Sequence, residues 1–167
     1  MAFPQVIRLG ISAFPARLAY GMIGLGIFFK AEQETGSVAI AGFAIGLNSL
    51  AGSLTAGIRG SVMDRFGQKW PIRILVPMYS GLILLLNTMD TRQSILITAF
   101  ILGITAPPIN LSVRPLWKDI VPDSYLRTAY AFDSSMMSTT SVIGPVVITA
   151  LSLSSRPGFG LGTIAAL

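Results

Sequence analysis

The run from Thr35 to Ile58 constrains this chain most, because it is 24 residues long and contains no charged side chain. An α-helix needs about 20 apolar residues to cross the ~30 Å hydrocarbon core of a bilayer, and inside that core the backbone must pair its own polar groups. A second uncharged run, from Ile74 to Met89, follows after a short charged stretch. The two runs predict consecutive membrane helices.

Composition supports a membrane protein and argues against other classes. Only 11% of the residues are charged, compared with about 25% in soluble domains, and the mean hydropathy is +0.70. There is no cysteine and no histidine, so we expect no disulfide, no metal site and no cofactor. The net charge of +5 does not predict nucleic-acid binding, because the cations lie at the ends of apolar runs. The sequence shows no nucleophile–base pair and no phosphate loop, so we do not predict an enzyme.

We therefore predict an all-α, polytopic transmembrane bundle that forms one domain over residues 1–167. It has about five full membrane helices and a partial sixth, expected at residues 11–29, 37–60, 71–89, 93–113, 127–153 and 159–167. The last segment has nine residues, which rise only ~14 Å against the ~30 Å core. We therefore expect the chain to be incomplete.

A polar decapeptide, Gly60 to Lys69, separates the two uncharged runs. We expect a tight hairpin in which Gly67 takes the positive φ of a sharp reversal and Gly60 lets its helix approach a neighbour closely. The decapeptide resembles the loop between helices two and three of the major facilitator superfamily, which carries G-x-x-x-D-R-x-G-R/Q-R/K. The matching residues are Gly60, Asp64, Arg65, Gly67, Gln68 and Lys69.

The resemblance implies a secondary transporter with two six-helix halves and the substrate site between them. It also implies that Asp64 and Arg65 hold the cytoplasmic ends of the halves together. The family's helix-five motif, G-x-x-x-G-P-x-x-G-G, is reduced here to Gly144 and Pro145, with Thr140 at the first glycine, so antiport is not supported. No arginine interrupts residues 93–113, and proton-coupling roles of the family's arginine in that helix do not carry over.

Three polar side chains are candidate substrate or coupling residues: Tyr20, Asn48 and Asn110. The resemblance implies that helices one and four line the cavity. A polar side chain in a membrane helix also bonds neighbouring helices, so both interpretations stay open. Pro107 and Pro108 remove two backbone donors and predict a kink, which is either a packing feature or a break that lines the substrate path.

Small residues predict the packing faces of the first two helices. In the second helix they recur at helical spacing, at Gly42, Gly46, Ser49, Ser53, Gly57 and Gly60. We expect this stripe to press against another helix, because close packing drives association in lipid. Gly21 and Gly24 are expected to permit close contact in the same way. Trp117 is expected in the aromatic belt at the membrane surface.

Arg17 and Asp133 are the two charges well inside the predicted helices, more than three residues from either end, and both are candidate coupling residues. Counted from Lys30 and Arg127, their depths agree at ~10 Å and ~9 Å from the inner edge of the core. Intramembrane charges usually pair or face water, so we predict a salt bridge or a shared aqueous vestibule. The alternative is that Arg17 snorkels to the headgroups and Asp133 joins a local serine cluster.

Nine of the 12 cations fall on one side of the predicted topology, which places that side and the N-terminus in the cytoplasm. We expect an integral protein of the plasma (inner) membrane. Its predicted function is the N-terminal part of a transporter that moves a small solute by alternating access. Predicted partners are the lipid bilayer, that solute, protons as a candidate coupling ion, and a missing C-terminal half or second chain. The alternative is a truncated or split product, or a half-sized subunit, without transport activity of its own.

Overall fold

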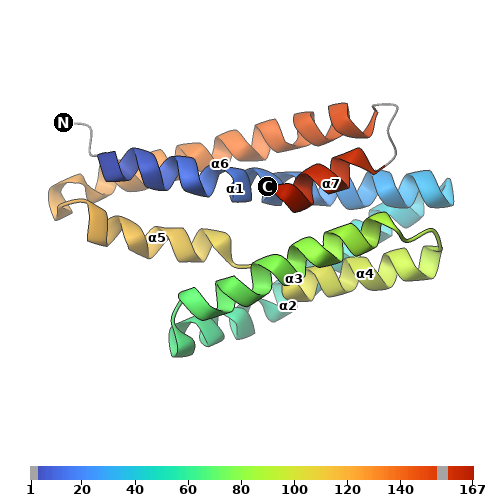
Figure 1. The fold of residues 1–167 in the computed structure, drawn as a ribbon, viewed down its shortest axis with the longest axis horizontal. Coiled ribbons are helices and arrows are strands. Elements are labelled where there is room, and N and C mark those ends of the chain that lie inside the picture. Colours follow the sequence, from blue (N-terminus) through green and yellow to red (C-terminus); the bar gives the residue numbers. More distant parts are fainter. Residues whose placement is uncertain (1–3, 154–157) are drawn as a thin grey trace.

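The computed structural model describes residues 4–153 and 158–167, without the side chains of residues 4, 5, 7 and 110–115. The described part contains only helices, which confirms the all-α prediction (Figure 1). The helices are α1 (Pro4–Thr35), α2 (Val38–Phe66), α3 (Lys69–Asn87), α4 (Arg92–Thr105), α5 (Ile109–Ile120), α6 (Asp123–Ser152) and α7 (Phe159–Ala166).

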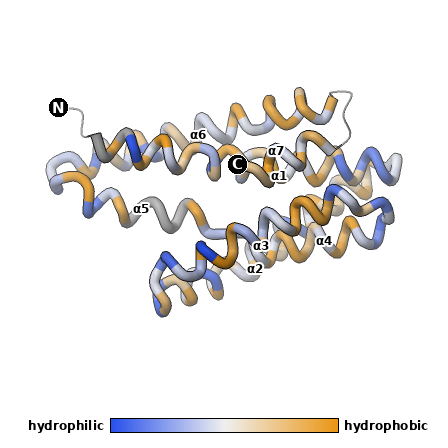
Figure 2. Tube along the Cα trace, viewed as in Figure 1, coloured by the Kyte–Doolittle hydropathy of each residue, from blue (hydrophilic) through white to orange (hydrophobic). Residues whose placement is uncertain are grey.

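Four helices in the described ranges, α1, α2, α3 and α6, are long and apolar enough to cross a membrane. α4 has 14 residues and α5 has 12, and a break of three residues, 106–108, separates them. Together they occupy the place of the predicted fourth span. Figure 2 shows hydrophobic residues along the length of the bundle and hydrophilic residues at its two ends, as a membrane-spanning bundle requires.

The predicted loops are too long. α2 continues through the decapeptide to Phe66, and only Gly67 and Gln68 separate it from α3; Gly67 has φ 74°, as predicted. The expected loop over residues 114–126 is also wrong, because α5 and α6 fill it except for two residues. Charged residues mark the edge of the hydrocarbon core, but they are compatible with a helix, so the helices extend beyond that edge.

The first helix extends in the same way. It was expected to end at Phe29, but α1 continues to Thr35 and ends at Gly36, which has φ 64°. Lys30 Nζ lies 2.6 Å from Glu34 Oε1, one helical turn further on. Such an (i, i+4) pair supports the added turn.

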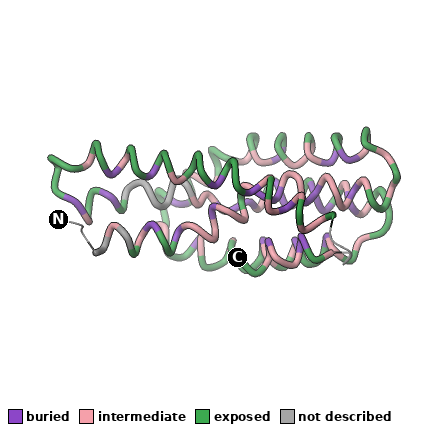
Figure 3. Tube along the Cα trace, turned by 90° about the horizontal axis from the view of Figure 1, so that it is seen from above, coloured by how far each residue is buried: buried purple, intermediate pink, exposed green. Residues whose placement is uncertain are grey.

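α1 lies at the centre of the bundle and packs mainly against α6 and α2, while α2 packs against α4. Buried apolar side chains from α1, α2, α3, α4, α6 and α7 form the main core, including Met22, Ile83, Leu102 and Ile148. Figure 3 shows buried positions where helices face one another and exposed positions along the outer sides. The outer sides carry large apolar residues such as Leu54 and Val142, which suits a lipid environment.

The predicted small-residue stripe of α2 does not pack within the described chain. Gly42, Gly46 and Gly57 are exposed, and a Cβ added at any of them, or at Gly60, would meet nothing within 4 Å. α2 instead uses the adjacent face, with Ala41, Ala44 and Ala51 buried. Helical periodicity defines a face but does not say which neighbour it meets.

The closest helix contacts involve other glycines. A Cβ on Gly103 of α4 would overlap the Asn48 carbonyl oxygen of α2. A Cβ on Gly21 of α1 would lie 2.7 Å from the Thr140 carbonyl oxygen of α6, which confirms the prediction for Gly21. The prediction for Gly24 is wrong, because nothing lies within 4 Å of its added Cβ. Gly144 forms the other side of the α1–α6 contact.

We expect Gly144→Ala to lower the free energy of unfolding by about 1–3 kcal/mol. Its added Cβ would lie 2.8 Å from the Gly21 carbonyl carbon, so α1 and α6 must separate. Unfolding in detergent micelles measures the loss. The matched control is Gly42→Ala, which meets nothing within 4 Å and should be neutral or slightly stabilising. Equal losses in both variants would contradict the close contact.

Candidate functional site

An arginine from α2 donates hydrogen bonds at the break between α4 and α5. Pro107 and Pro108 have no N–H, so the carbonyls four residues earlier, of Gly103 and Ile104, lose their helical partners. Arg59 Nη1 donates to both carbonyl oxygens, at 2.7 Å and 3.1 Å. The predicted kink is therefore a full break, and its unpaired carbonyls are satisfied by α2.

Arg59 is held firmly but its charge is not neutralised by an acid. Its Nη2 donates to the Gly52 carbonyl oxygen at 2.7 Å, and its buried Nε has no partner. Among the described residues no carboxylate forms an ion pair with it. It lies seven residues before the end of α2, or ~10 Å along the helix. From the sequence, Arg59 is only one of the nine cations on the predicted cytoplasmic side, although two successive prolines signal a need for donors.

A cavity of about 520 Å³ lies beside this arginine, between α1, α2, α3 and α4. Tyr20 and Asn48, two of the predicted substrate contacts, line it together with Arg59 and Tyr79. Tyr79 is only 8% exposed, and in the described part of the chain neither tyrosine hydroxyl forms a hydrogen bond. Two phenol groups and a guanidinium thus converge on one cavity inside an apolar bundle. Tyr79 was not among the candidate substrate contacts predicted from the sequence, which came from the first, second and fourth predicted helices.

The other predicted contacts have mixed outcomes. Asn48 Nδ2 donates to the Ala99 carbonyl oxygen of α4 at 3.0 Å, so this residue bonds a neighbouring helix as well as lining the cavity. Asn110 belongs to α5, but its side chain lies outside the described residues. Whether Tyr20, Asn48 or Asn110 contacts a substrate stays a prediction.

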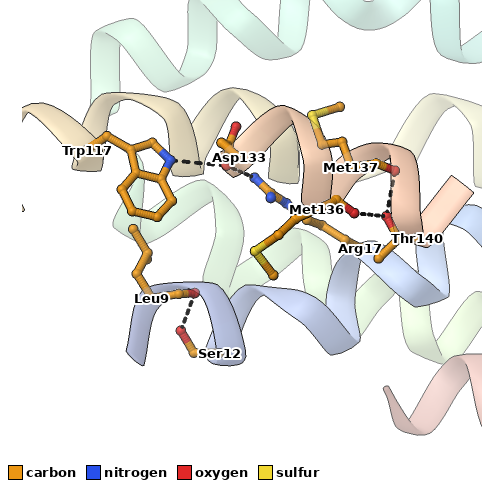
Figure 4. Close-up of polar contacts among 8 residues, drawn as sticks. All are labelled: Leu9, Ser12, Arg17, Trp117, Asp133, Met136, Met137 and Thr140. Carbon is orange, nitrogen blue, oxygen red and sulfur yellow. Dashed lines mark hydrogen bonds and ion pairs between the residues drawn. The ribbon is translucent and has the colours of Figure 1, made fainter. Parts of the chain in front are cut away.

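The predicted pairing of the two intrahelical charges is confirmed. Arg17 Nη2 of α1 lies 2.6 Å from Asp133 Oδ1 of α6, and both side chains are 2% exposed (Figure 4). Trp117 of α5 donates from Nε1 to the same oxygen at 3.1 Å. The alternative, in which Arg17 snorkels to the headgroups, is wrong. The cluster joins three helices through one carboxylate oxygen.

Trp117 was expected in the aromatic belt, and this is also wrong. Its side chain is fully buried, and its ring contacts that of Phe132 edge-on, with centroids 6.2 Å apart. An indole N–H needs a partner when it is buried, and Asp133 supplies one. Tryptophan favours the membrane surface because its amphipathic ring can reach water there. The ring of Trp117 does not reach water.

The decapeptide lies at one end of the bundle and faces outward. Asp64, Arg65 and Lys69 are exposed, and no ion pair involves Asp64 within the described ranges. The Arg65 guanidinium lies 5.7 Å from the centroid of the Phe66 ring. The expected close approach at Gly60 is wrong for the part of the chain described here. The latch role of Asp64 and Arg65 stays a prediction.

Comparison with known proteins gives one match. A family model described as Major Facilitator Superfamily matches residues 9–167. Searches of curated proteins and of solved structures found no match.

Proposed function

The chain belongs to the major facilitator superfamily of membrane transporters, and on that premise we propose that it forms the N-terminal half of a transporter that works by alternating access. The observation that carries this proposal is the polar cavity of about 520 Å³ between α1, α2, α3 and α4. Irregular backbone at membrane depth is tolerated only inside protein or beside water, and the α4–α5 break satisfies this condition at the cavity. Tyr20, Asn48, Arg59 and Tyr79 would contact the solute or the water around it.

We further propose that the N-terminus is cytoplasmic and that the protein resides in the plasma (inner) membrane. The beginning of α1, the α2–α3 turn and the α5–α6 turn lie toward the same end of the bundle (Figure 1). Most of the cations lie on the helix ends near these segments, and the positive-inside rule assigns such an end to the cytoplasm. Asp64 and Arg65 would then face the cytoplasmic end of a second half.

That second half is proposed as either a C-terminal continuation or a second chain. The exposed stripe of α2, with Gly42, Gly46 and Gly57, offers a surface that a helix can approach closely. Superfamily transporters place the substrate between two such halves. The second candidate function is a half-sized or split product that does not transport alone. The exposed stripe also favours this alternative, because it is a packing surface that the described part of this chain leaves uncovered. One half alone would supply only one wall of a cavity.

We expect a cysteine at Ser53 to react with a membrane-impermeant maleimide from both sides of the membrane. Ser53 is exposed and lines the cavity, and alternating access opens a cavity to each side in turn. Residues 1–167 contain no cysteine, so once any cysteine in the rest of the gene product is replaced, a single label reports on one site. The measurement is the labelling rate in right-side-out and inside-out vesicles that contain the full-length gene product.

The control is Val142→Cys, on the outer side of α6, where a residue 68% exposed in the structure should meet lipid. It is expected to stay unlabelled from both sides. Labelling of Ser53→Cys from one side only would contradict alternating access and favour the non-transporting alternative.

A further inference from the structure

A second cavity, also of about 520 Å³, lies between α1, α3 and α5. It is distinct from the polar cavity and lies toward the end of the bundle that carries the α2–α3 turn. Its walls are mainly apolar, and the side chains that matter here are Leu9, Ala16, Ile72, Val76, Ile109 and Leu116. We call it the basic-rimmed groove, because two cations also line it.

The two cations are Lys69 and Arg73, one turn apart on the first two turns of α3. Both are exposed, and neither forms an ion pair with a described carboxylate. Trp70, which is 67% exposed, lies between them in the sequence. Exposed tryptophan and cations together mark the headgroup level of a bilayer. The groove therefore runs from the headgroup level, at Lys69, toward the hydrocarbon, at Val76.

We propose that the basic-rimmed groove binds one anionic phospholipid. The phosphate lies at Lys69 and Arg73, and one acyl chain follows the groove past Ile72 and Val76. A soluble anion would neutralise the cations but leave the apolar walls unfilled, whereas a zwitterionic lipid would fill the walls with less charge compensation. An anionic lipid does both. If the proposed orientation holds, the site faces the cytoplasmic leaflet, where anionic lipids carry the surface charge.

The test is mass spectrometry of the intact chain, released from detergent after incubation with equal amounts of phosphatidylglycerol and phosphatidylcholine. We expect one phosphatidylglycerol to be retained in preference to phosphatidylcholine. The double variant Lys69→Gln, Arg73→Gln should bind phosphatidylglycerol about 30-fold more weakly, since each cation near an anionic surface contributes roughly a factor of five. Inorganic phosphate at millimolar concentration should not displace the lipid, because it cannot fill the apolar walls.

The matched control is Lys118→Gln, Arg127→Gln, which removes two exposed cations at the same end of the bundle but outside the groove. It should retain the lipid. A third variant, Val76→Trp, fills the groove and leaves both cations in place, and it should also lose the lipid.

Several results would overturn the proposal: equal retention of both lipids by the native chain, equal loss in the two double variants, or displacement by phosphate. If Val76→Trp does not fold, the two double variants decide the question alone, since they change only exposed side chains. The assay measures lipid retention and not transport, so a negative result would not contradict the proposed function. Equally, a negative result in the cysteine-labelling experiment would not contradict lipid binding.

Discussion

Replacing Arg17 by leucine is expected to lower the free energy of unfolding by about 3–5 kcal/mol, because it leaves the Asp133 carboxylate buried without a counterion. Asp133→Leu should cost a similar amount, because it leaves the Arg17 guanidinium buried without a counterion. It also removes the acceptor of the Trp117 indole N–H. The double variant Arg17→Leu, Asp133→Leu should be milder than either single variant, since no unpaired charge remains. Reversible unfolding in mixed micelles measures all three.

The chain contains its own control pair. Lys30 and Glu34 also lie 2.6 Å apart, but both are at the end of α1, and the Glu34 side chain is 33% exposed. Their coupling energy should be only about 0.3–0.5 kcal/mol, as for other helical pairs near water. Additive losses for Arg17 and Asp133 would contradict the predicted interaction between them. A coupling energy between Arg17 and Asp133 as small as that of the control pair would contradict the burial of the Arg17–Asp133 pair.

Arg59→Leu is expected to have the second large effect, a loss of about 2–6 kcal/mol. It removes the donor of two carbonyls, those of Gly103 and Ile104, and the described residues offer them no other donor because residues 107 and 108 are prolines. Arg59→Lys should lose part of this stability, because an ammonium group lacks the planar fork that reaches several acceptors at once. The measurement is the same unfolding transition.

The prolines allow a direct test of the cause. In a Pro107→Ala, Pro108→Ala background, both missing N–H donors return, and Arg59→Leu should then cost clearly less than in the native chain. Arg127→Leu, at an exposed position on α6, is the matched control and should stay within about 0.5 kcal/mol of the native protein. An unchanged cost of Arg59→Leu in the alanine background would show that Arg59 acts through something other than the broken helix.

Several features follow from the amino-acid sequence alone. Long uncharged runs determine a membrane bundle, since a bilayer leaves the backbone few other solutions. The spaced residues of the decapeptide indicate the family, which the match over residues 9–167 shows. Arg17 and Asp133 could be paired by depth, because the helical rise is fixed and these were the two charges more than three residues inside a predicted span. Gly67 was identified as the turn because a positive φ favours glycine.

The tertiary structure alone decided how the helices face one another. α2 has two faces of small residues, and only packing against α4 selects the one with Ala44 and Ala51. Helix ends were misplaced because charges indicate the edge of the hydrocarbon core, while capping and proline end a helix. Arg59 was overlooked for a related reason. A side chain that satisfies carbonyls on another helix, 44 and 45 residues away, has no local signature, and its role exists only once α2 and α4 are in contact.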